Sequence, residues 1–70
     1  MRKKFSLVGV DGNAFNVMAY VKVAMRESGF SKKEWSEYMN DCMRGDYDRL
    51  LILSEDIIER CNDALGLDAE

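Results

Sequence analysis

The stretch that decides the fold is AFNVMAYVKVAM, residues 14–25. At about 100° per residue, six of its apolar side chains fall on one helical stripe: Ala14, Val17, Met18, Val21, Ala24 and Met25. Four more apolar residues lie elsewhere on the helical wheel: Phe15, Ala19, Tyr20 and Val23. A helix that is apolar nearly all round needs neighbours on more than one side. Because a chain of 70 residues offers few neighbours, we expect a second copy of the chain to supply some of them.

Length and composition indicate one domain, spanning residues 1–70, with a small core. At 47% hydrophobic and 33% charged residues, the chain is too apolar to stay disordered. The core of a domain this small stabilises the fold by only about 3–5 kcal/mol, and such domains commonly add disulfides, a metal or association. The sequence has no histidine, and Cys42 and Cys61 are too few for a disulfide framework. Association is therefore the expected additional source of stability.

Residues 3–10 have the alternation and the β-branched content of a strand, with apolar side chains on both faces. No second strand is evident in the sequence, so the backbone groups of this one need another partner. Three arrangements meet that need: pairing with the same strand of a second copy, pairing with the tail after Leu65, or an extended segment lying on the helices. We favour the first arrangement. Together with the first helix, it predicts a homodimer interface at Phe5, Leu7, Val8, Val10, Tyr20 and Val23.

The first helix is bounded by turn and cap residues. Asp11-Gly12 is a turn dipeptide, and Asn13 or Asp11 can cap the helix by accepting hydrogen bonds from its free N–H groups. Gly29 suits the left-handed position beyond a helix C-terminus, so the first helix is expected to end there.

Two further helices follow. Ser31 and Glu34 have the S-x-x-E spacing of a capping box, after which the apolar residues keep a helical spacing: Trp35, Tyr38, Met39, Cys42 and Met43. Gly45 is expected to stop this helix and Asp46 to cap the third, over residues 47–62. The apolar residues of the third helix cover somewhat less than half of the wheel: Leu50, Leu51, Leu53, Ile57, Ile58 and Cys61. The predicted fold is α+β and mainly helical, one short N-terminal strand followed by a three-helix bundle.

The residues capable of metal or covalent chemistry have structural explanations. The pairs Asp11 with Asn13 and Asp46 with Asp48 could offer oxygens to a cation, but neither extends to an EF-hand loop, and capping explains them better. The two cysteines lie on apolar helix faces, where thiols usually pack as small hydrophobes. We expect no catalytic residues, no metal and no cofactor. The N-terminus lacks the pattern of a secretory signal and no apolar run is long enough to span a membrane, so a cytoplasmic protein is expected.

Charge is distributed unevenly along the chain. Residues 1–33 carry a net charge of +5 and residues 34–70 one of −8, for a total of −3. Seven basic residues lie in the first half: Arg2, Lys3, Lys4, Lys22, Arg26, Lys32 and Lys33. They could meet nucleic-acid phosphates. The third helix, however, exposes acidic residues that would repel such a backbone, so nucleic-acid binding is the weaker alternative.

Two motifs of this sequence resemble a known pattern. LVGVDGNAF at residues 7–15 and GDYDRLL at residues 45–51 are similar to the order LVGxDGNAF … GDYDxLL in a family of short, uncharacterised bacterial and phage-borne open reading frames. The resemblance covers nearly the whole chain and implies a small protein of a bacterium or mobile element, with a common fold and no implied activity. Both motifs lie at junctions between predicted elements, so these residues read as fold-defining turns: Asp11, Gly12, Asn13, Gly45 and Asp46.

The sequence therefore predicts a non-enzymatic interaction or accessory protein, homodimeric and able to contact another protein. A nucleic-acid-binding regulator that uses the basic N-terminal half is the alternative.

Overall fold

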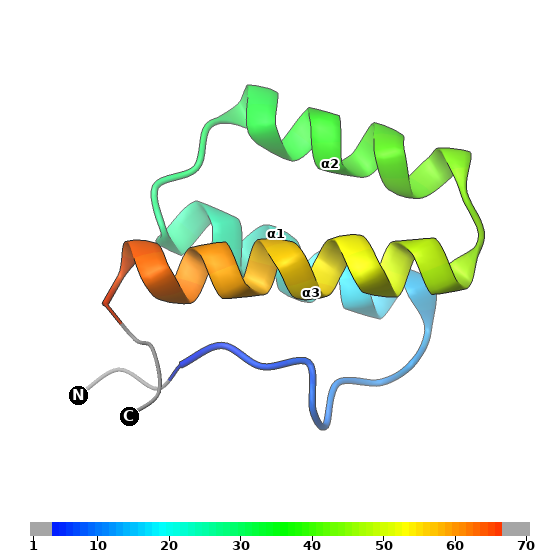
Figure 1. Ribbon diagram of the computed structural model, residues 1–70, viewed down its shortest axis with the longest axis horizontal. Helices are drawn as coiled ribbons and strands as arrows, with labels where there is room; N and C mark the ends of the chain where they lie inside the picture. Colours follow the sequence, from blue (N-terminus) through cyan, green and yellow to red (C-terminus); the bar gives the residue numbers. More distant parts are fainter. Residues whose placement is uncertain (1–3, 67–70) are drawn as a thin grey trace.

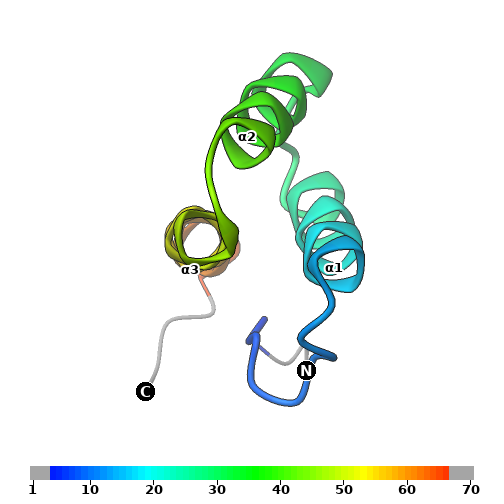
Figure 2. The ribbon, with the colours of Figure 1, turned by 90° about the vertical axis from the view of Figure 1, so that its right-hand side faces the viewer.

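The computed structural model describes residues 4–66, which form three helices (Figure 1): α1 (Ala14–Glu27), α2 (Lys32–Arg44) and α3 (Tyr47–Ala64). Seen along the bundle in Figure 2, the helices occupy the corners of a triangle, and the segment before α1 lies on the side away from α2. The three predicted helices are confirmed, and α3 runs two residues beyond its expected end. No helix among these residues is long and apolar enough to cross a membrane.

The stripe of α1 forms the centre of the core. Of its six predicted residues, Ala14 is half-buried. The other five are buried: Val17, Met18, Val21, Ala24 and Met25. The other two helices add the remaining buried hydrophobic residues: Tyr38, Cys42, Leu50, Ile58 and Cys61. A helix with this stripe is covered by α3 on one side and by α2 on another, which is why the fold is a bundle.

Both ends of α1 carry the predicted signals. Asn13, rather than Asp11, is the N-cap, because its side-chain oxygen accepts from the backbone N–H of Phe15 at 2.8 Å. At the other end Gly29 has a φ of +86°, and the N–H of Phe30 donates to the carbonyl of Met25 at 2.9 Å. These two features form a Schellman motif, which ends the helix and turns the chain toward α2.

The junctions around α2 also follow the sequence. Ser31 and Glu34 form a reciprocal capping box, with the Ser31 N–H donating to the Glu34 carboxylate at 2.8 Å. Gly45 ends α2 in an extended conformation, and the carboxylate of Asp46 accepts from the N–H of Arg49 at 3.0 Å. The expected stop and cap between α2 and α3 are therefore confirmed.

The predicted strand over residues 3–10 is not seen within residues 4–66, and Lys3 lies outside the described residues. The N–H of Val10 instead donates to the carbonyl of Leu7 at 3.1 Å, closing a turn in which Gly9 has a φ of +87°. The Asn62 side chain binds both backbone polar groups of Phe5: it accepts from the N–H at 2.7 Å and donates to the carbonyl at 3.0 Å. One amide side chain thus replaces a strand partner, and the segment lies on the helices, which was the third arrangement considered.

A buried polar pair joins α2 to α3. The hydroxyls of Tyr38 and Ser54 are 2.7 Å apart, and Ser54 donates to the carbonyl of Leu50 at 2.7 Å. Burial raises the pKa of the Tyr38 phenol, which therefore stays protonated near neutral pH. Among the described residues no buried side-chain polar atom lacks a partner, and this pair provides a buried hydrogen bond between α2 and α3.

Candidate functional site

The residues of the predicted dimer interface divide into two groups. Phe5, Leu7, Val10 and Tyr20 are half-buried against the chain's own core. Phe5 and Tyr20 meet edge to face, with ring centroids 6.3 Å apart, and the Tyr20 hydroxyl accepts from the N–H of Ser6. Val8 and Val23 remain exposed, and Val8 keeps 91% of its surface accessible. Only part of the predicted apolar surface is therefore left for another molecule.

A more continuous apolar surface lies where the two sequence motifs meet. The Tyr47 hydroxyl donates to the carbonyl of Gly12, which joins the start of α3 to the turn before α1. Beside this link, Phe15, Met43 and Tyr47 are all exposed and surround one hollow of about 220 Å³. We call these three residues the Phe15 surface. Its floor is built by core residues that include Met18, Cys42 and Leu50.

The Phe15 surface continues along the outside of α1. Ala19 and Val23 are exposed and follow Phe15 at intervals of four residues, which places all three on one side of the helix. Ala19 is small, so the backbone of α1 can be approached closely at this point. An apolar stripe thus runs from the junction of the motifs along the exposed side of α1 toward its C-terminal end.

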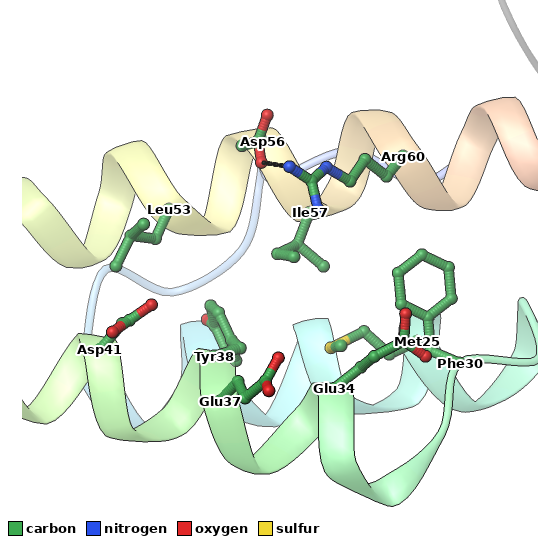
Figure 3. Close-up of a pocket in the computed structure, with 10 residues that line it drawn as sticks. All are labelled: Met25, Phe30, Glu34, Glu37, Tyr38, Asp41, Leu53, Asp56, Ile57 and Arg60. Atoms are coloured by element: carbon green, nitrogen blue, oxygen red, sulfur yellow. Dashed lines mark ion pairs between the residues drawn. The ribbon is translucent and has the colours of Figure 1, made fainter.

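A second surface is the groove between α2 and α3, with α1 behind it (Figure 3). Glu34, Glu37 and Asp41 stand in a row along α2, on the side that faces the groove. The groove has a volume of about 230 Å³, and apolar residues from the helices and the α1–α2 turn line it: Met25, Phe30, Tyr38, Leu53 and Ile57. We call this the acidic groove. The sequence analysis did not place these carboxylates beside a hollow.

The electrostatics of the acidic groove are dominated by carboxylates. The hydrogen bond from the Ser31 backbone is the main cause that lowers the pKa of Glu34, and the one from the Ser31 side chain adds to it. Both favour the ionised carboxylate. Asp56 and Arg60 of α3 form an exposed ion pair at 3.1 Å, and Arg60 is the one basic residue among those that line the groove. The positive charge of Arg60 also acts on Glu34, but four carboxylates line the groove against this single basic side chain: Glu34, Glu37, Asp41 and Asp56.

The basic residues of the N-terminal half do not form one surface. Lys22, Arg26 and Lys32 surround a hollow between α1 and α2 that also contains Trp35, and the Lys22 ammonium lies 5.6 Å from the centroid of the Trp35 ring. We call this the basic groove. Lys4 lies elsewhere, beside acidic residues of α3, while Arg2 and Lys3 lie outside the described residues.

The groups considered for metal or covalent chemistry have structural contacts. Cys42 and Cys61 are buried and unpaired, and burial raises the pKa of both thiols. Asp11 accepts from the N–H of Asn13 and the side chain of Asn16, and Asp46 caps α3. Within residues 4–66 no three Cys, Asp or Glu side chains are grouped so that they could hold a metal ion.

Residues 4–66 form a small three-helix fold whose surface hollows include the apolar one at the Phe15 surface, the acidic groove and the basic groove. No family model matches the chain, and neither do any of the curated proteins or solved structures compared with it. The family resemblance of the two motifs therefore stays a prediction.

Sequence reasoning missed two parts of these surfaces. Phe15 was noted as lying off the apolar stripe, which was the available signal, but it was not included in the predicted interface. The acidic groove had a weaker signal, the spacing of Glu34, Glu37 and Asp41 on one side of α2.

Proposed function

We propose that this chain is a non-enzymatic, homodimeric protein-interaction module, an accessory protein of a bacterium or mobile element. The main observation behind this proposal is the Phe15 surface, where Phe15 is 74% exposed next to exposed Met43 and Tyr47. Contiguous apolar surface of this kind on a small protein marks a contact with another macromolecule. The copies meet through the Phe15 surface and the stripe formed by Ala19 and Val23.

Composition and charge support a second copy as the occupant. Aromatic residues and methionine, which make up the Phe15 surface, are the residue types enriched at the centres of protein interfaces. Arg44, Asp46, Asp48 and Arg49 follow Met43 in the chain, so residues of both signs flank the surface. A two-fold contact places the same residues on both sides, and neighbours of mixed sign can then pair rather than repel.

Replacing Phe15 by glutamate is expected to convert the protein to a monomer. The change removes a central aromatic contact and adds a charge to the apolar interface, so the dimer dissociation constant should rise at least about 30-fold. Light scattering at tens of micromolar should give twice the chain mass of 8.0 kDa for the wild type and the chain mass for F15E.

The matched control is Ile52→Glu, because Ile52 is 69% exposed on α3 and is not part of the Phe15 surface. This variant should remain dimeric. A monomeric wild type, or equal loss of dimer in both variants, would contradict the proposed interface.

The basic groove supports nucleic-acid binding as a second candidate function. Its three basic side chains and Trp35 offer charges for phosphates and a ring on which a base can stack. The net charge of −3 and the acidic residues on the other faces make this candidate weaker.

If the second candidate is right, the protein should be retained on a polyanion column at neutral pH and elute earlier as salt increases. Lys22→Gln with Lys32→Gln should abolish retention, whereas Lys4→Gln with Arg60→Gln, which removes the same charge elsewhere, should largely preserve it. Retention that falls equally in both double variants would show a non-specific charge effect.

A further inference from the structure

The acidic groove combines two features that call for different contacts. Its floor offers apolar surface from Phe30, Leu53 and Ile57, which are half-buried. Along one wall, Glu34, Glu37 and Asp41 lie at positions i, i+3 and i+7 of α2, on one side of the helix and over about 10 Å of its length. An occupant must therefore supply both an apolar group and positive charges spaced along a line.

The volume of the groove favours a side chain over a small organic molecule. Pockets for drug-sized ligands measure about 300–1,000 Å³. At about 230 Å³, the acidic groove is smaller and can take one large apolar side chain. This side chain would act as the anchor of a longer segment that lies outside the hollow.

The spread of the carboxylates argues against a bound cation and for an extended cationic partner. In the part of the chain that the structure describes, no three acidic or cysteine side chains converge on one point. Glu37 and Asp41 have no hydrogen bond or ion pair with another side chain of residues 4–66, so they can be contacted without breaking an existing interaction. Lysine or arginine side chains one and two turns apart on a second helix match this spacing.

We infer that the acidic groove binds a cationic amphipathic helix of a partner protein, with an apolar side chain on the floor and basic side chains against Glu37 and Asp41. This is the helix-in-groove mode of recognition, in which apolar anchors provide affinity and flanking charges set orientation. The inference rests on the proposed protein-interaction function and specifies the chemistry of the partner. The residues of the groove and of the Phe15 surface do not overlap, so a dimer leaves both acidic grooves open.

The probe for this inference is a fluorescently labelled 18-residue peptide of leucine and lysine whose leucines form one face of a helix. Its anisotropy is titrated with the full chain at physiological ionic strength. A second peptide of the same composition, with the leucines redistributed so that no apolar face forms, should bind at least about tenfold more weakly, because it cannot place an anchor on the floor.

The groove is tested with two double variants of equal charge. Glu37→Gln with Asp41→Asn should raise the dissociation constant of the first peptide about five- to tenfold. Glu55→Gln with Glu59→Gln, which removes two charges near the N-terminal segment, should change it less than about twofold. Equal effects of both pairs, or equal binding of both peptides, would overturn the inference.

Failure of the dimer is distinguished by repeating the titration with F15E and measuring the mass in the same samples. If the protein is monomeric and its peptide binding still depends on Glu37 and Asp41, the groove inference holds and the proposed dimer is rejected. If the protein is dimeric but its peptide binding is unchanged by the substitutions at Glu37 and Asp41, the proposed dimer holds and the groove inference is rejected.

Discussion

Replacing Met25 by alanine is expected to destabilise the fold by about 2–5 kcal/mol. Met25 is only 2% exposed and lies between the helices, where it forms part of the wall of both the acidic and the basic groove. Its truncation removes apolar contacts and leaves a cavity. The helices cannot close this cavity, because caps and turns fix their ends. Because the core of such a domain contributes about 3–5 kcal/mol, M25A should be largely unfolded at moderate urea concentrations where the parent is folded. Unfolding followed by circular dichroism measures the difference.

The matched control is Met43→Ala, which removes the same side chain from a position that is 66% exposed. Both variants are compared in the F15E background, so that loss of association does not enter the free energy of unfolding. We expect M43A to change it by less than about 0.5 kcal/mol. Similar losses in the two variants would show that Met25 is not central to the core.

Replacing Asn62 by alanine is expected to destabilise the protein by about 2–3 kcal/mol and to release the segment before α1. The Asn62 side chain is buried, and its two hydrogen bonds to Phe5 are the polar link between that segment and α3. Without them, the half-buried N–H and carbonyl of Phe5 lose their partners, which costs about 1–3 kcal/mol for each buried group left unsatisfied. Amide hydrogen exchange should show loss of protection at Phe5 and at Val10, while the amides in the middle of α1 stay protected.

Asn40→Ala serves as the control, because Asn40 is exposed on α2. It should leave both the stability and the exchange of the Phe5 amide unchanged within error. If N62A kept the Phe5 amide protected, the segment would be held by its apolar contacts rather than by Asn62.

The helices could be predicted because their signals are local. The stripe of α1, the capping box of Ser31 with Glu34 and the stop at Gly29 all depend on residues a few positions apart. The structure confirms them with little change in boundaries.

The N-terminal segment could not be predicted in the same way, because its conformation depends on a distant side chain. The alternation of residues 3–10 is typical of a strand, but Asn62 satisfies the backbone of Phe5 and Gly9 allows a turn. Nothing near Phe5 in the sequence indicates that partner. An asparagine among the apolar positions of the third helix was the only available signal.

The grooves also depend on how the helices are placed relative to one another. Ser54 lies four residues from both Leu50 and Ile58, in the middle of an apolar face, and this position was the signal that it needs a buried partner. Sequence alone did not identify that partner as Tyr38. The hydroxyl pair joins α2 to α3 next to the acidic groove, which Tyr38 helps to line.

The clasp of Phe5 by Asn62 has a consequence for the order of folding. It joins positions 57 residues apart, whereas the turns between consecutive helices close over a few residues. Since closing a long loop costs more entropy, we expect the two helical hairpins to assemble in the rate-limiting step and Phe5 to reach Asn62 afterwards. The contact between Asn62 and Phe5 then mainly slows unfolding, and it has little effect on the folding rate.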